Sequence, residues 1–233
     1  MQPRDRETAG IGGELGARAQ ALFEERQRAI CAELERTDGS GAFRYDQWER
    51  ADGGGGLTAI MQEGSIFEKA GVNTSTVWGQ LDDTALTKLG GKERRFFATG
   101  ISMVLHPRSP MVPTMHANFR YLARGAHTWF GGGSDLTPSY PLREDVITFH
   151  RAWKDVCDRH DGGYYPRFKR WCDEYFTIPH RHEMRGVGGI FFDDLSDQPE
   201  KAFAFVTDCC RNVLAASPLG MGTAAVRSCP APW

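Results

Sequence analysis

The 233-residue sequence lacks several features that would each point to a class of protein. No apolar run approaches the roughly 18 residues of a membrane-spanning helix, and the opening MQPRDRETAG has no apolar segment typical of an export signal. Its 28 basic and 30 acidic residues give a formal charge of −2, so there is no global positive field to hold a polyanion. We therefore expect neither membrane insertion nor nucleic-acid binding.

Cysteine is also sparse. The six cysteines include no CxxC pair and are too few for a disulfide framework in a chain of this length. Free cysteines are typical of a reducing compartment, which predicts a cytoplasmic location. The sequence has no internal repeat and no low-complexity linker, so residues 1–216 are predicted to form one domain. Residues 217–233, SPLGMGTAAVRSCPAPW, show neither helical nor strand periodicity and predict an irregular tail.

Apolar periodicity predicts an α+β fold in which helices pack on a largely antiparallel sheet. Helical spacing indicates helices over residues 15–34, 143–160, 164–176 and 197–216. Alternation with period two indicates strands over residues 100–106 and 115–123, and a further strand is expected over 188–195. Asp197 and Glu200 have the spacing of a capping box at the start of the last helix.

Two runs of glycine interrupt this periodicity. Gly53 to Gly56 predicts a flexible loop rather than a phosphate-binding loop, because no Lys followed by Ser or Thr comes after it. Gly131 to Gly133 is expected to end a short strand, at a point where the backbone turns tightly or approaches a ligand closely.

Polar side chains gather on one side of each of the two central strands. Three prolines between these strands make a stiff connection, so both polar sides are expected to line one cleft. Burying such groups costs stability unless they pair with one another or with a ligand. The set consists of Ser102, His106, His116, Asn118 and Arg120.

Several of these residue types suit acid–base chemistry on an anionic substrate. His116 is a candidate acid or base, because imidazole titrates near neutral pH. Arg120 lies on the same side and offers a guanidinium fork that matches a carboxylate. Arg181 and Arg185 are alternatives for that role, or else belong to a solvated turn. Asp135 either holds a cationic or pyrrole-like N–H group or only fixes the turn that contains it.

Histidine is also a common ligand of divalent metals. The sequence has no HExxH motif, so spacing alone leaves open whether the histidines bind a metal or fill ordinary structural positions. The candidate ligands are His106, His116, His150 and His180.

Five unusual segments, in the same order, resemble the oxygen-dependent coproporphyrinogen III oxidases. The resemblance runs from about Ile30 to about Leu214. The segments are QEGSIFEKAGVN, HPRSPMVPTMHANFRY, HTWFGGGSDLTP, YYPRFKRWCDEYF and HRHEMRGVGGIFFDDL.

This resemblance implies an oxidoreductase of haem biosynthesis. Such enzymes use dioxygen to decarboxylate two propionates of coproporphyrinogen III oxidatively, which gives protoporphyrinogen IX. The resemblance further implies no organic cofactor, a divalent metal in part of the family, and a homodimer. The implied fold is a large, flat, mainly antiparallel sheet sandwiched between layers of helices, with the substrate in a cleft between them.

The resemblance also implies roles for individual residues. His116 matches a proton donor, and Asp135 matches an acidic residue that holds pyrrole N–H groups. The implied substrate-binding residues are Ser102, Asn118, Phe119 and Arg120. The implied metal ligands are His106, His116, His150 and His180.

The sequence departs from the family at its C-terminal end. Family members continue for many tens of residues beyond the helix at 197–216, with further strands, substrate contacts and much of the dimer interface. We therefore expect a truncated domain whose dimerisation and activity are in question. An inactive tetrapyrrole-binding remnant is the alternative. A histidine-liganded metal hydrolase, which would be inhibited by a chelator and need no oxygen, is a third hypothesis.

Overall fold

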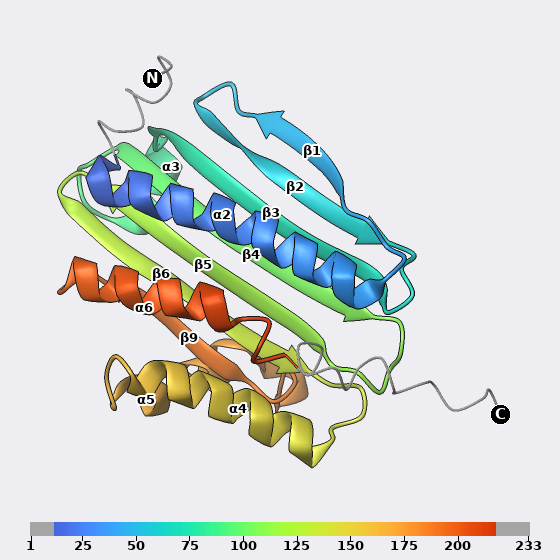
Figure 1. Cartoon of the computed structure of the whole chain (residues 1–233). Coiled ribbons are helices and arrows are strands. Elements are labelled where there is room, and N and C mark those ends of the chain that lie inside the picture. The colour runs from blue at the N-terminus through green and yellow to red at the C-terminus, as the bar shows by residue number, and fades with distance from the viewer. Residues whose placement is uncertain (1–11, 218–233) are drawn as a thin grey trace.

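A seven-stranded antiparallel sheet organises the computed structural model, which describes residues 12–217 (Figure 1). The first six strands follow one another as a meander, and the last strand pairs with β6 at one edge. In spatial order the strands are β1 (Arg44–Glu49), β2 (Gly54–Gln62), β3 (Phe67–Gln80), β4 (Arg95–Pro107), β5 (Thr114–Arg124), β6 (His127–Thr137) and β9 (Gly189–Leu195).

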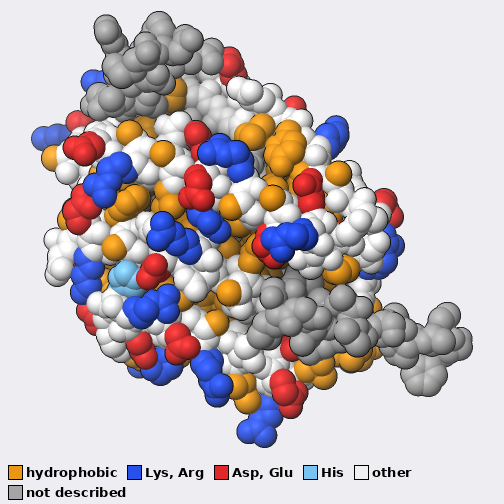
Figure 2. Space-filling view, in the orientation of Figure 1, with side chains coloured by type: hydrophobic (Ala, Val, Ile, Leu, Met, Phe, Trp, Pro, Cys, Tyr) orange, Lys and Arg blue, Asp and Glu red, His pale blue; other side chains and the backbone are white. Residues whose placement is uncertain are grey.

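Helices cover one face of this sheet. Figure 1 shows α2, α4 and α6 in front of the strands, and Figure 2 shows basic and acidic side chains interspersed on this side of the molecule. The helices are α2 (Gly13–Asp38), α3 (Asp83–Leu89), α4 (Arg143–Asp158), α5 (Tyr164–Tyr175) and α6 (Pro199–Asn212). Between α5 and β9 lie the short elements β7 (Thr177–Ile178), η1 (Pro179–Arg181) and β8 (Glu183–Met184). None of the helices within residues 12–217 is long and apolar enough to cross a membrane.

The strict alternation of side chains along β5 separates the two faces of the sheet. Every second residue of β5 is buried beneath the helices, whereas the residues between them are only partly buried. On the neighbouring strand β4, Ser102 and His106 are exposed. We call this second side the open face. It carries Ser102 and His106 of β4, His116, Asn118 and Arg120 of β5, Gly131, Gly133 and Asp135 of β6, and Phe191 and Asp193 of β9.

Aromatic side chains fill the space between the sheet and the helices. Phe192 of β9 lies at the centre, with ring centroids 6.4 Å from Phe119, 5.2 Å from Phe168 and 5.1 Å from Phe205. All four rings are buried, and full burial of such a side chain stabilises a fold by roughly 1.5–3 kcal/mol. This cluster joins α5 and α6 to the strands that carry the polar residues.

Helix α5 also wraps around the β9 edge of the sheet. Its Phe168 packs on the helix-covered side, but Trp171 and Tyr175 pack against Phe191, with ring centroids 5.3 and 4.1 Å away. Phe191 pairs in register with Gly133 and therefore lies on the open face. The C-terminal end of α5 thus closes one side of the open face.

A single carboxylate joins the end of α2 to the β2–β3 connection. Asp38 is 6% exposed and accepts hydrogen bonds from the backbone N–H groups of Gly41, Ser65, Ile66 and Phe67, at 2.7–3.0 Å. Burial alone would raise the pKa of Asp38, but these four donors hold it well below its usual value.

The structure confirms the α+β class, the large antiparallel sheet, the two central strands, and the predicted helices at 15–34, 143–160, 164–176 and 197–216. Only one helical layer lies within residues 12–217; the second layer expected from the family resemblance is not among them. The assignment of residues 1–216 to a single domain stays a prediction. Apart from Ser217, the predicted tail lies outside the described residues.

The expected positions of both glycine runs, in a loop and at the end of a strand, were wrong. Gly54 to Gly56 belong to β2, where a Cβ on Gly56 would lie 2.4 Å from the Thr74 carbonyl oxygen and 2.6 Å from the Trp48 ring. Gly131 to Gly133 lie inside β6 rather than at its end. In both places the absence of a side chain allows close packing within a strand.

The predicted capping box does not form either. The N-cap of α6 is Gln198, which makes no side-chain capping bond, and Pro199 occupies the first turn. Glu200 instead accepts hydrogen bonds from Arg18 of α2, at 2.7 and 3.0 Å. The acidic residue therefore joins two helices rather than capping one.

We predict that Asp38→Asn lowers the free energy of unfolding by about 3 kcal/mol at pH 7, because an amide NH2 would face backbone donors. The folded-state pKa of Asp38 is depressed, so its contribution is complete above the unfolded pKa of about 3.9 and is lost as the pH falls below it. Urea unfolding at pH 7 and pH 3 should show a difference from wild type that shrinks in acid. Asp46→Asn, on exposed β1, is the control and should stay within about 0.5 kcal/mol. Equal losses from both variants would contradict the assignment.

Candidate active site

Strands β4, β5 and β6 bring most of the predicted residues together on the open face. The register pairs Ser102 with Asn118, and His116 with Asp135. His106 and His116 are neighbours, with ring centroids 6.2 Å apart. Both polar strand sides therefore lie on one face of the sheet, since antiparallel neighbours point their paired side chains to the same face. That this face forms a cleft stays a prediction.

A buried carboxylate forms the centre of this group. Asp135 has a side chain only 3% exposed, and Arg185 Nη2 donates to both of its oxygens, at 2.9 and 2.8 Å. His116 Nδ1 lies 3.5 Å from Asp135 Oδ2. Asp135 thus accepts hydrogen bonds from a guanidinium and has the His116 imidazole as a neighbour without a hydrogen bond between them.

Two nitrogens of this group lack partners. His116 Nδ1 and Arg185 Nε are buried and have no hydrogen-bond partner within the described part of the chain. Buried polar atoms are normally satisfied by protein, water or ligand. The two nitrogens are therefore positions where a water molecule or a ligand would supply the missing hydrogen bond.

Arg185 is positioned by a tight segment that runs along β6. Val187 N–H donates to the Leu136 carbonyl, and Leu136 N–H donates to the Gly188 carbonyl. Gly186 has a φ of +63°, and a Cβ there would lie 2.2 Å from the Leu136 carbonyl oxygen. Only glycine fits this approach, so the sequence RGVGG is the signal that places Arg185 beside Asp135.

The other basic candidate of this segment has a different environment. Arg181 pairs with Glu183 in an exposed turn, at 2.6 Å between Nε and Oε1. The guanidinium of Arg185, in contrast, lies 4.0 Å from the centre of the Phe176 ring. The structure therefore places Arg185 beside Asp135 and Arg181 in an exposed turn, and a functional role for Arg185 stays a prediction.

Arg120 lies farther along β5, over the glycine triplet. Its Nη2 donates to Asp193 Oδ2 at 3.1 Å, and its Nη1 donates to Asn118 Oδ1 at 3.3 Å. The side chains of Arg120 and Asp193 are each about one-third exposed. Sequence reasoning missed Asp193, although period-two alternation in GGIFFDDL places it on the same side as Phe191.

The side chain of Phe119 does not lie with the other predicted substrate-binding residues. Its ring is buried on the helix-covered side and packs against Trp153 and Phe192. Because alternate residues of a strand face opposite ways, the side chain of Phe119 points away from its neighbours Asn118 and Arg120. The structure assigns this ring to the core rather than to a substrate-binding surface.

The four candidate metal ligands do not come together. His150 lies on α4, where its Nδ1 accepts from the Tyr165 hydroxyl at 3.0 Å and its Nε2 donates to the Val187 carbonyl at 3.1 Å. Burial lowers the pKa of His150 and raises that of Tyr165 to about 12, which keeps both groups neutral. His180 lies exposed in η1. Within residues 12–217, no three His, Cys, Asp or Glu side chains form a group that fits a metal ion.

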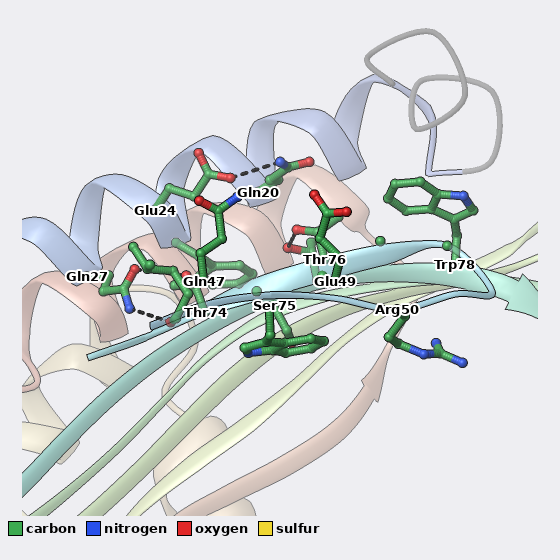
Figure 3. Close-up of a pocket in the computed structure, with 18 of the residues that line it drawn as sticks. Gln20, Glu24, Gln27, Gln47, Glu49, Arg50, Thr74, Ser75, Thr76 and Trp78 are labelled. Atoms are coloured by element: carbon green, nitrogen blue, oxygen red, sulfur yellow. Dashed lines mark hydrogen bonds between the residues drawn. The ribbon is translucent and has the colours of Figure 1, made fainter. Parts of the chain in front are cut away.

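A cavity of about 740 Å³ lies between α2 and strands β1 to β3, and none of the predicted site residues lines it (Figure 3). Gln27, which is 1% exposed, forms its inner wall. The Gln27 amide donates to the carbonyls of Leu57 and Val72, and its oxygen accepts from Thr74. This cavity is separate from the open face.

Comparisons with known proteins show the family of this chain. The family model for coproporphyrinogen III oxidase matches residues 18–218. The chain belongs to the coproporphyrinogen III oxidase family. It is 48% identical over 212 residues to the oxygen-dependent coproporphyrinogen-III oxidase of Drosophila melanogaster. This match covers 84% of this chain and 54% of the Drosophila protein.

Two further members of the coproporphyrinogen III oxidase family show the same pattern. The Rattus norvegicus mitochondrial enzyme is 46% identical and the match covers 86% of this chain and 49% of the relative. The Glycine max chloroplastic enzyme is also 46% identical, with 86% and 56% covered. The chain therefore spans about half the length of the curated relatives it matches.

The predicted cytoplasmic location is contradicted. The rat and human members of the family are named as mitochondrial, and the soybean member is named as chloroplastic. The prediction rested on free cysteines, and the five described cysteines are indeed free and buried. Free thiols indicate a reducing compartment but do not distinguish one such compartment from another.

We predict that Asp135 and Arg185 are energetically coupled. Arg185→Gln leaves a buried carboxylate without its main partner and should lower the free energy of unfolding by about 2 kcal/mol. The double variant with Asp135→Asn should lose at least about 1 kcal/mol less than the sum of the single variants. Urea unfolding measures all four corners of this cycle. Arg181→Gln is the matched control and should change stability by less than about 0.5 kcal/mol. Additive losses would contradict the coupling.

Proposed function

We propose that the open face binds coproporphyrinogen III and carries part of the active site for its oxygen-dependent oxidative decarboxylation to protoporphyrinogen IX. The observation that carries this proposal is the buried Asp135, held by Arg185 beside His116, on the same face as Arg120. Family membership supports the reaction class. Because the chain spans about half of its relatives, its own activity is part of the proposal.

Each residue has a role that suits its surroundings. Arg120 anchors a propionate, because a guanidinium binds a carboxylate through two parallel hydrogen bonds. Asp135 accepts a hydrogen bond from a pyrrole N–H, and Arg185 fixes the orientation of that carboxylate. His116 supplies or accepts a proton at the reacting side chain. Ser102 and Asn118 contribute further polar contacts to the substrate.

The reaction balances with dioxygen as the electron acceptor. The β-carbon of a propionate loses a proton, and the bond to the carboxylate breaks to release carbon dioxide. The remaining vinyl group is two electrons more oxidised, and dioxygen takes up those electrons with two protons to form hydrogen peroxide. The electron-rich pyrrole makes an organic cofactor unnecessary. The proposal includes a homodimer, which the family resemblance implies.

A catalytically inactive, tetrapyrrole-binding remnant is the second candidate function. The chain covers 49–56% of the relatives cited above, so binding and turnover are measured separately for this chain. The two candidates share the binding surface and differ in turnover.

We predict that the purified 233-residue chain consumes oxygen when given coproporphyrinogen III, and that Arg120→Ala raises the Michaelis constant at least about tenfold, as expected for the loss of one charged hydrogen-bonded anchor. Oxygen uptake measures turnover, and porphyrin fluorescence after oxidation identifies the product. Arg181→Ala, in the exposed turn, is the matched control.

Binding without turnover by the folded chain would favour the remnant. Unchanged kinetics in Arg120→Ala would contradict the role of that guanidinium. Absence of both binding and turnover would contradict the proposed function.

A further inference from the structure

We infer that Asp193 is the positioning residue of Arg120: it holds the guanidinium across the bare backbone of Gly131 so that its outer edge meets a substrate carboxylate. The inference rests on the proposed function, which makes Arg120 the anchor of a propionate. It adds a specific residue of β9 to that site.

Arg120 and Asp193 can approach each other because Gly131, over which they meet, has no side chain. Arg120 pairs in register with Gly131, and Asp193 reaches the same point from β9. A Cβ on Gly131 would lie 2.3 Å from Asp193 Oδ1 and 3.0 Å from Arg120 Nε. The first contact is shorter than a Cβ atom tolerates and the second is tight, so the first glycine of the triplet makes room for this ion pair.

Asp193 is itself held in place by an irregularity of β9. The register between β6 and β9 shifts between Phe130 and Gly132, opposite this part of β9. The next residue, Asp194, has a φ of +53°, and its backbone N–H donates to Asp193 Oδ1 at 3.0 Å. One carboxylate oxygen is therefore fixed by the backbone, and the other accepts from Arg120.

The two partners of Arg120 leave part of its fork available. Nη2 donates to Asp193 and Nη1 donates to Asn118. A guanidinium carries five N–H donors, so the remaining ones can bind an external carboxylate while the group stays oriented. Orientation matters because two parallel hydrogen bonds form only when the planes of the guanidinium and the carboxylate coincide.

A carboxylate beside an anion-binding arginine can act in two opposite ways. If the carboxylate orients the arginine, it strengthens substrate binding. If it only neutralises the charge of the arginine, it weakens substrate binding. Asparagine removes the charge but keeps one acceptor oxygen, which can still accept from Arg120 when its NH2 group replaces the oxygen that faces the Asp194 N–H. Alanine removes both the acceptor and the charge.

The test measures the dissociation constant of coproporphyrin III, the stable oxidised tetracarboxylate, by fluorescence for wild type, Asp193→Ala and Asp193→Asn. We expect Asp193→Ala to weaken binding about tenfold, as for the loss of one hydrogen bond to a charged group, and Asp193→Asn to stay within about threefold of wild type. Gly131→Ala should reproduce the loss, and combining it with Asp193→Ala should add less than the two losses together.

Asp194→Asn is the matched control. It removes the same charge from the neighbouring residue, which pairs with His127 rather than with Arg120, and asparagine suits its left-handed backbone. Asp194→Asn should bind coproporphyrin III with the same dissociation constant as wild type. Unchanged or tighter binding in Asp193→Ala would overturn the inference.

A second readout needs no ligand. The Nε–Hε NMR signal of Arg120, identified by its loss in Arg120→Lys, should be sharp in wild type and Asp193→Asn and broadened or lost in Asp193→Ala. If wild type fails to bind coproporphyrin III, the proposed function fails, and this signal still decides whether Asp193 positions Arg120. An unaltered signal in Asp193→Ala would overturn the inference.

Discussion

Side-chain alternation along β5, held in register between β4 and β6, is the constraint on which the rest of the structure depends. It sends Phe119 and its buried neighbours beneath the helices and sends His116, Asn118 and Arg120 to the open face. A slip of one residue would exchange the two sets and expose the core. The aromatic cluster around Phe192 therefore stabilises the register, and the register in turn aligns the polar residues of three strands into one surface.

Two ion pairs on this surface join side chains that come from distant parts of the sequence. Arg185 reaches Asp135 from a loop, and Arg120 reaches Asp193 across β6. Each depends on glycine, at Gly186 and Gly131, because a Cβ would occupy the space of a backbone oxygen or a carboxylate. The glycine-rich segments thus allow charged groups from distant parts of the chain to approach β6 closely.

Local patterns predicted the elements whose periodicity is unbroken, such as the long helix α2 and the strands β4 and β5, and they predicted that His116 and Arg120 share a face. They missed β1, β2 and β3, since the glycine run at the start of β2 is typical of a loop and only packing against Trp48 explains it. They also left Arg185 undecided and missed Asp193, because those contacts join residues 50 and 73 positions apart and no local period encodes them. The role of Phe119 was carried over from a resemblance, against the alternation that assigned its ring to the core.

The central claim is that the open face, and not the helix-covered side, meets the tetrapyrrole. The most direct measurement follows the imidazole NMR signals of His116 and His150 while coproporphyrin III is added to the chain. The two residues differ in their surroundings, because His116 lies beside Asp135 on the open face and His150 of α4 is enclosed by Tyr165 and Val187. We predict that the His116 signal shifts at the concentration where the ligand binds, while the His150 signal stays in place. A shift of His150 with an unmoved His116 would contradict it.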